Sequence, residues 1–250
     1  MSDTSSNHPQ YPSAEPPAKK QLWGPWTALW IGFLIFVVPM FVIAEIAYLT
    51  HWNMPNQDLQ QFYMYAGSIA ITLILLRMVL QKRYNIGFKQ LGLNHFYFRY
   101  IGYALLTLPI YFICSAALTE IVSSLYHGFN IAQQQNTGFT GSAHSSVLEL
   151  TAVFVSLVII PPLVEETLFR GFLLQGMRKR FPAVIAVILV SLIFGAAHGQ
   201  LNVGIDTFTL SCFLCFLRIK TESLWPGILL HATKNFIAFI ALYHLFQSFF

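Results

Sequence analysis

The chain is organised around PPLVEETLFRGFLLQGMRKR, residues 161–180. This stretch places two adjacent carboxylates, Glu165 and Glu166, inside an apolar run, with Arg170 four residues after the second. An ionisable side chain at the centre of a bilayer costs about 2.5–3.5 kcal/mol on insertion scales, so such residues are rarely incidental. If this stretch lies in a membrane, its carboxylates are candidates for a functional site.

The composition of the chain is typical of a membrane protein. Of the 250 residues, 56% are hydrophobic and only 10% are charged, whereas an average soluble domain has roughly 25% charged residues. Runs of around twenty apolar residues are long enough to cross the ~30 Å hydrocarbon core as helices. We therefore expect an all-α, polytopic transmembrane helical bundle. The expected spans are residues 26–50, 61–80, 100–126, 146–177, 183–198, 203–217 and 224–250.

The basic residues predict the orientation of these spans. Lys and Arg occur before the first span and after the second, fourth and sixth, whereas the loops after the first, third and fifth have none. The positive-inside rule then gives seven spans with a cytoplasmic N-terminus, and we expect the cell membrane as the location. An eighth span is possible if Pro161 and Pro162 divide the long fourth segment. Because the net charge of +4 is spread over these loops, we expect lipid and not nucleic acid as a partner.

The first motif is EExxxR, formed by Glu165, Glu166 and Arg170. Adjacent residues on a helix point about 100° apart, whereas residues four apart meet on one face. Glu166 and Arg170 are therefore expected to neutralise each other and to leave Glu165 facing another group. The alternative is a purely structural network of all three charges.

Two further motifs follow on later spans. Phe194 and His198 form FxxxH, and the small residues between them permit close approach of a neighbouring helix. His231 and Asn235 form HxxxN and project from one helical face. The structural alternatives are a histidine at the membrane interface and a hydrogen bond between packed helices. Lys234 either reaches the interface or pairs with a carboxylate such as Asp206.

The depths of these residues overlap. With a rise of 1.5 Å per residue, Glu165 lies about 20 Å from the basic cluster that begins at Arg178. His198 lies up to roughly 27 Å from that cluster, and His231 and Asn235 lie about 16–22 Å from Lys220. Unrelated structural polar groups would have no reason to share one layer, so the overlap favours a single site.

The ordered set of three motifs resembles the CAAX protease and bacteriocin-processing family, intramembrane endopeptidases related to the type II CAAX prenyl protease. The resemblance covers about residues 146–245. It implies a catalytic transmembrane core at 146–250, preceded by N-terminal transmembrane helices at 23–145. Residues 1–22, rich in Ser, Pro, Gln and Lys, are expected to form a disordered cytoplasmic tail.

The resemblance also implies roles for the motif residues. Glu165 would be the general base and His198 its partner in activating water, while His231 and Asn235 would hold the oxyanion. Glu166 and Arg170 would support the geometry, and Phe194 would wall the cavity. The substrate would be a peptide or protein at the membrane. No cofactor is expected; zinc is the alternative, although the set lacks the HExxH pair of many zinc proteases.

Two other classes of function remain open at this level. Membrane-embedded carboxylates and histidines also form proton relays, so a proton-coupled transporter is one alternative. The other is a non-catalytic membrane scaffold or immunity protein that uses the motifs for structure alone.

Overall fold

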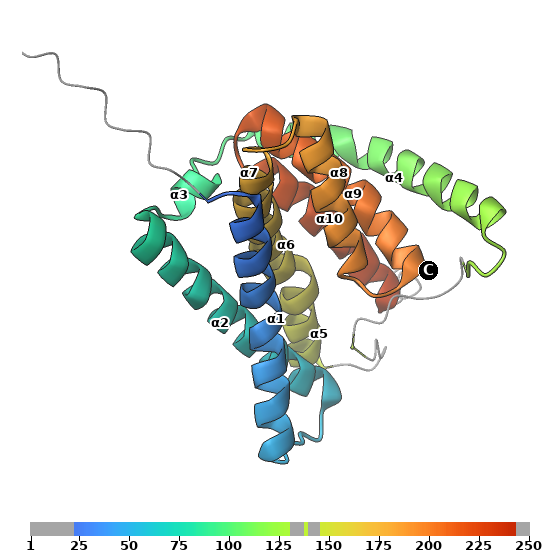
Figure 1. The fold of residues 1–250 in the computed structure, drawn as a ribbon. Helices are drawn as coiled ribbons and strands as arrows, with labels where there is room; N and C mark the ends of the chain where they lie inside the picture. Colours follow the sequence, from blue (N-terminus) through green and yellow to red (C-terminus); the bar gives the residue numbers. More distant parts are fainter. Residues whose placement is uncertain (1–22, 131–137, 140–145, 244–250) are drawn as a thin grey trace, which may run out of the picture.

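The computed structural model describes residues 23–130, 138–139 and 146–243, and in these residues the regular secondary structure is entirely helical (Figure 1). The predicted all-α fold is therefore confirmed, while the predicted tail, residues 1–22, lies outside the described residues. The helices are α1 (Pro25–Leu49), α2 (Gln57–Tyr84), α3 (Phe88–Leu91), α4 (Arg99–Leu125), α5 (Val147–Phe154), η1 (Val155–Ile159), α6 (Ile160–Glu165), η2 (Glu166–Leu173), α7 (Leu174–Met177), α8 (Ala183–Ala196), α9 (Leu201–Thr221) and α10 (Trp225–Leu242).

In this part of the chain, six helical segments are long and apolar enough to cross a membrane. They are α1, α2, α4, the continuous segment Val147–Met177, α9 and α10. All seven expected spans are helical within the described residues, and residues 244–250 of the last one lie outside them. Helix α8 has only 14 residues, about 21 Å, against the ~30 Å hydrocarbon core. Whether α8 makes a seventh crossing stays a prediction.

The fourth span is one long helix with two π-helical stretches. Between Val147 and Met177, α-helical turns alternate with the π-helices η1 and η2. Pro161 and Pro162 lie just after η1 and do not divide the segment, although each lacks the N–H that would continue the helical hydrogen bonds. The eighth span considered at these prolines therefore does not form.

This segment, α5 to α7, lies between two groups of helices (Figure 1). On one side, α1 and α2 pack against each other, and α1 also packs against η2 and α7. On the other side, α4, α9 and α10 pack together and α8 packs along α9. Helices α8, α9 and α10 all contact the central segment. The glutamates of this segment are thus within reach of both later motifs.

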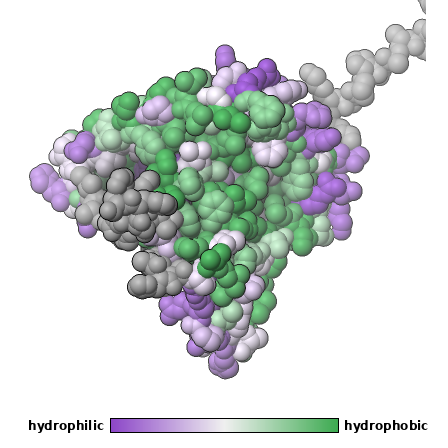
Figure 2. Space-filling model, turned by 180° about the vertical axis from the view of Figure 1, so that it is seen from behind, coloured by the Kyte–Doolittle hydropathy of each residue, from purple (hydrophilic) through white to green (hydrophobic). Residues whose placement is uncertain are grey.

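The outer surface is suited to lipid. The most apolar windows of α1 and α4 have mean hydropathies of 2.4 and 1.8, yet only 17% of each window is buried. Figure 2 shows a broad hydrophobic face with hydrophilic residues at its margins. An apolar surface of this extent requires a bilayer around it. The protein is an integral membrane protein.

Candidate functional site

The π-helix η2 positions the charged motif. Glu165 is the last residue of α6 and Glu166 is the first of η2, whose eight residues are all buried. A π-helix has i→i+5 hydrogen bonds and occurs mostly as short segments at functional sites. Regular α-helical spacing was expected here, and the wider π-helical turn of η2 is the main local difference.

Glu166 and Arg170 form the predicted ion pair. Arg170 Nη1 lies 2.9 Å from Glu166 Oε1, with side-chain exposures of 0% and 1%. The guanidinium also lies over the ring of Phe194, with its Cζ 4.3 Å from the ring centroid. Two buried charges are tolerated because each neutralises the other, and removing one partner of such a pair typically costs about 3–5 kcal/mol.

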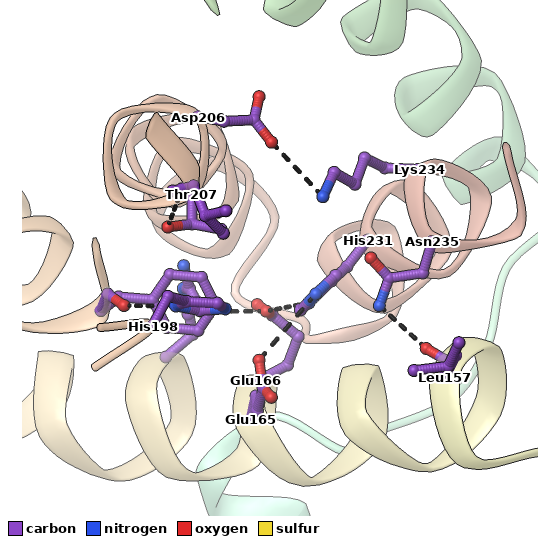
Figure 3. A network of polar contacts seen from close by, with 12 residues as sticks. Leu157, Glu165, Glu166, His198, Asp206, Thr207, His231, Lys234 and Asn235 are labelled. Carbon is purple, nitrogen blue, oxygen red and sulfur yellow. Dashed lines mark hydrogen bonds and ion pairs between the residues drawn. The ribbon is translucent and has the colours of Figure 1, made fainter. Parts of the chain in front are cut away.

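His231 on α10 contacts both carboxylates (Figure 3). Its Nδ1 lies 3.2 Å from Glu166 Oε1, and its Nε2 lies 3.9 Å from Glu165 Oε2. The expected separation of roles is therefore incomplete, because Glu166 interacts with His231 as well as with Arg170. Glu165 remains the more accessible carboxylate at 20% exposure, and its Oε2 has no hydrogen-bond partner among the described residues.

His198 follows the end of α8 and has a defined tautomer. Its Nδ1 lies 2.8 Å from the carbonyl oxygen of Phe194. A carbonyl oxygen can only accept, so Nδ1 carries the hydrogen and Nε2 keeps its lone pair in the neutral ring. His198 lies within electrostatic range of Glu165 and His231, and Figure 3 places the three residues together.

Phe194 packs among the charged groups, and its expected role as a wall of the cavity stays a prediction. Its ring lies 5.0 Å from that of His198 and 6.0 Å from that of His231, both edge to face. The small residues after it also act as expected. A Cβ built on Gly195 would lie 2.6 Å from the carbonyl oxygen of Gly204, so the backbones of α8 and α9 touch at this point.

Asn235 contacts a different part of the helix. Its Nδ2 donates to the carbonyl oxygen of Leu157 at 2.9 Å. That carbonyl lacks its usual partners, since Pro161 and Pro162 stand where the i+4 and i+5 amides would be and proline has no N–H. The double proline thus creates the acceptor by which α10 is fastened to η1. One amide hydrogen and the Oδ1 atom of Asn235 remain available for other contacts.

Lys234 pairs with Asp206, one of the two outcomes left open by the sequence. Its Nζ lies 3.3 Å from Asp206 Oδ2. The other carboxylate oxygen accepts hydrogen bonds from Tyr111 at 2.5 Å and from Ser115 at 2.6 Å. This network joins α4, α9 and α10 beside the site. Tyr111 and Ser115 gave no signal in the sequence, because hydroxyl groups are common in membrane helices.

Gly227 is a second residue that the motifs did not identify. A Cβ at this position would lie 3.1 Å from Glu166 Oε2. The glycine stands four residues before His231, on the same face of α10, and it leaves the space that the buried carboxylate occupies. A glycine one turn before a motif histidine is the signal that could have identified it.

An apolar groove of about 640 Å³ runs between α1, η2 and α8. Its walls include Gly32 and Phe36 on α1, Phe169 on η2 and Ala197 after α8. Phe169 packs on Phe194 with ring centroids 4.9 Å apart, and Ala197 precedes His198. The groove therefore reaches the edge of the carboxylate site.

The donors available for a metal are the carboxylates and histidines just described. Within residues 23–130, 138–139 and 146–243, no group of three or more His, Cys, Asp or Glu has the arrangement of a metal site. Zinc takes three or four such ligands at about 2.0–2.3 Å, and Glu166 is already paired with Arg170. Independence of metal stays a prediction that chelation can test.

Comparison with known proteins bears on the same segment. Residues 147–237 match the family model described as "Type II CAAX prenyl endopeptidase Rce1-like". The chain is also 32% identical over 94 residues to an "Uncharacterized 24.3 kDa protein" of Escherichia coli, a match that covers 36% of this chain and 43% of that protein. No solved structure matches the chain. The family predicted from the three motifs is therefore confirmed over residues 147–237, which match the type II CAAX prenyl endopeptidase Rce1-like family and contain all seven motif residues.

Proposed function

We propose that the protein is an intramembrane endopeptidase that hydrolyses a peptide bond of a membrane-associated peptide or protein. The proposal rests on the convergence of Glu165, His198 and His231 in a largely buried site (Figure 3). These residues come from three separate helical segments. The family match over residues 147–237 supports CAAX-type processing.

In the proposed mechanism, Glu165 is the general base. Its Oε2, which has no hydrogen-bond partner among the described residues, accepts a proton from a water molecule. The lone pair on Nε2 of His198 accepts a hydrogen bond from the other O–H of that water and orients it. The oxygen attacks the carbonyl carbon of the substrate. Protonated Glu165 then passes its proton to the departing amide nitrogen as the C–N bond breaks. The products are a carboxylic acid and an amine, and the glutamate is regenerated.

The oxyanion requires fixed donors. In its protonated form, His231 donates from Nδ1 to Glu166 and from Nε2 towards the oxyanion. The second amide hydrogen of Asn235 is the other donor, while its first holds Leu157. Donors that are already fixed in a dry site stabilise a developing oxyanion strongly, and losing one typically costs about 10²–10³-fold in rate. Glu166 and Leu157 therefore act as positioning groups for the two donors.

We further propose that the apolar groove receives the hydrophobic part of the substrate. Its lining is almost entirely apolar and includes Phe169, which packs on Phe194, and Ala197, which precedes His198. A chain of methylene or isoprenoid groups would pack against this lining by van der Waals contact, in place of the lipid tails that otherwise cover it. This position would bring an adjoining peptide bond towards Glu165.

The decisive test compares Glu165→Gln with Glu120→Gln, a matched loss of a carboxylate on the exposed side of α4. Membrane proteomes of strains that express each variant would be compared for an uncut precursor, and the purified variants would be assayed on that precursor. We expect Glu165→Gln to lower the cleavage rate by about 10²–10⁴-fold, as for loss of a general base. Normal cleavage by a correctly folded Glu165→Gln protein would refute the proposal.

A proton-coupled transporter is the second candidate, favoured by the Lys234–Asp206 pair within the spans. Charges inside membrane helices commonly mark proton or substrate paths. Flux of substrate across liposomes without peptide cleavage would support it over the protease. A non-catalytic scaffold would instead tolerate Glu165→Ala with its phenotype intact.

We also propose that the N-terminus is cytoplasmic and that the protein resides in the cell membrane. The alternation of basic loops supports this orientation. A membrane-impermeant thiol reagent tests it when single cysteines are placed in a Cys-free background. Labelling of a cysteine at Lys82 in intact cells would contradict it.

A further inference from the structure

A polar pocket separate from the carboxylate site lies at one end of the helical bundle, where α3, α7 and the C-terminus of α9 meet. Its volume is about 430 Å³. Four cationic side chains and one carboxylate line it, a formal excess of three positive charges. They are Lys89, Arg178, Lys179, Arg218 and Glu222.

The pocket is built by specific contacts. Gln175 Nε2 lies 3.2 Å and 3.3 Å from the carbonyl oxygens of Gln90 and Leu91, and Arg218 Nη2 donates to Leu91 O at 3.0 Å. The next residue, Gly92, has φ +113°, and a Cβ there would lie 2.9 Å from Arg218 Cζ. Helices α7 and α9 therefore hold the turn after α3 in one conformation, and the guanidinium is fixed in place.

The charges of this pocket are not neutralised within the described residues. None of the four cations has a carboxylate within ion-pair distance in that part of the chain. Arg218 lies within electrostatic range of both Glu222 and Arg178, and its Nε has no hydrogen-bond partner among the described residues. Like charges held this close together repel one another, and a bound anion would relieve that repulsion.

The surroundings place the pocket at the depth of lipid headgroups. It lies where α7 and α9 end, and the neighbouring segment has a cluster of aromatic side chains. The Phe96 ring lies 5.8 Å from that of Trp225, whose Nε1 donates to Asn94 O at 2.8 Å. Tryptophan and tyrosine concentrate at membrane interfaces, and basic pockets between membrane helices bind anionic headgroups.

We propose that this pocket binds the phosphate-bearing headgroup of an anionic phospholipid. Arg178 and Lys179 contact the phosphate, and the fixed guanidinium of Arg218 forms the back of the pocket. Phosphate is favoured because arginine binds its oxygens with paired, charge-assisted hydrogen bonds. This binding does not depend on the proposed peptidase activity.

The test uses the purified full-length protein in detergent. It is titrated with dioleoylphosphatidylglycerol or dioleoylphosphatidylcholine, and the bound lipid is measured by native mass spectrometry. We expect Arg178→Gln/Lys179→Gln to weaken phosphatidylglycerol binding by roughly thirtyfold, the size expected for losing two basic contacts to an anionic lipid. The matched control is Lys82→Gln/Arg83→Gln at the exposed end of α2, which we expect to bind like the wild type.

A variant with the opposite expected effect controls for misfolding. Glu222→Gln removes the carboxylate of the pocket, and we expect it to tighten phosphatidylglycerol binding several-fold. The proposal is overturned if phosphatidylcholine binds equally well or if the two double variants lose affinity equally. It is also overturned if inorganic phosphate binds alone as tightly as the lipid, since the pocket would then be a site for free phosphate.

Discussion

The carboxylate site and the basic pocket at α3, α7 and α9 differ in how far their charges are compensated. In the site, Glu166 and Arg170 neutralise each other inside the protein and are almost completely buried, with His231 packed against the carboxylate. In the pocket, four cations lie near the surface without a carboxylate in ion-pair distance among the described residues. Charges that compensate one another hold the fold, whereas charges left uncompensated can recruit a ligand. The following variants test this contrast, from the largest expected effect to the smallest.

Replacing Arg170 with methionine should have the largest effect on stability. It leaves Glu166 buried without its counter-charge, which typically costs about 3–5 kcal/mol of unfolding free energy. Chemical unfolding in detergent micelles would measure it. The double variant Arg170→Met/Glu166→Gln should recover much of the loss, and Glu165→Gln, at a more exposed position, should change stability little. Equal losses for Arg170→Met and Glu165→Gln would show that the pair does not hold the fold.

Gly227→Ala should have a smaller effect on stability with a larger one on activity. The new methyl group would lie 3.1 Å from Glu166 Oε2, and overpacking of this kind costs about 1–3 kcal/mol. His231 would shift with the carboxylate, so kcat should fall more than KM rises. Gly102→Ala is the control, because no atom lies within 4 Å of the Cβ at that position. If both variants behave alike, the space around Glu166 is not critical.

Asp206→Asn should give a moderate effect. The asparagine oxygen can still accept from Tyr111 and Ser115, so the main loss is the ion pair with Lys234. We expect a destabilisation of about 1.5–2 kcal/mol, the lower part of the range for a hydrogen bond to a charged group. A double-mutant cycle with Lys234→Met would measure the coupling between the two side chains. A coupling energy near zero would show that the ion pair between Asp206 and Lys234 does not contribute to stability.

The smallest effect on stability is expected for Arg178→Gln/Lys179→Gln. Both side chains are exposed and have no ion-pair partner among the described residues. The unfolding free energy in lipid-free micelles should therefore change by no more than about 0.5 kcal/mol. Added phosphatidylglycerol should stabilise the wild type more than this variant. A large loss of unfolding free energy without lipid would instead show that these residues, like Arg170, hold the fold.

The sequence predicted the features that follow from the cost of charge in lipid. Because an uncompensated charge is expensive there, the spacing of Glu166 and Arg170 was sufficient to predict their pairing. The shared depth of Glu165, His198 and His231 likewise predicted that they would meet. These inferences depend on hydropathy and helical rise, which are properties of the sequence.

Other features depend on three-dimensional packing. The π-helical winding of η2 has no compositional signature, so the contact of His231 with both carboxylates was not foreseen. The missing amides of Pro161 and Pro162 imply an unpartnered Leu157 carbonyl, but which donor would fill it depends on how α10 is rotated. The choice of Asp206 as the partner of Lys234 depends on the same rotation.

The 14-residue length of α8 bears on the bilayer around the protein. Several of its apolar side chains face outwards, among them Val184, Ile188 and Leu192, so lipid tails meet a helix roughly 9 Å shorter than the hydrocarbon core. Hydrophobic mismatch of this kind is relieved when the bilayer thins locally. Water then lies closer to His198, just beyond the end of α8, than it would beside a full-length span. The proposed peptidase should therefore work faster in thin bilayers than in thick ones.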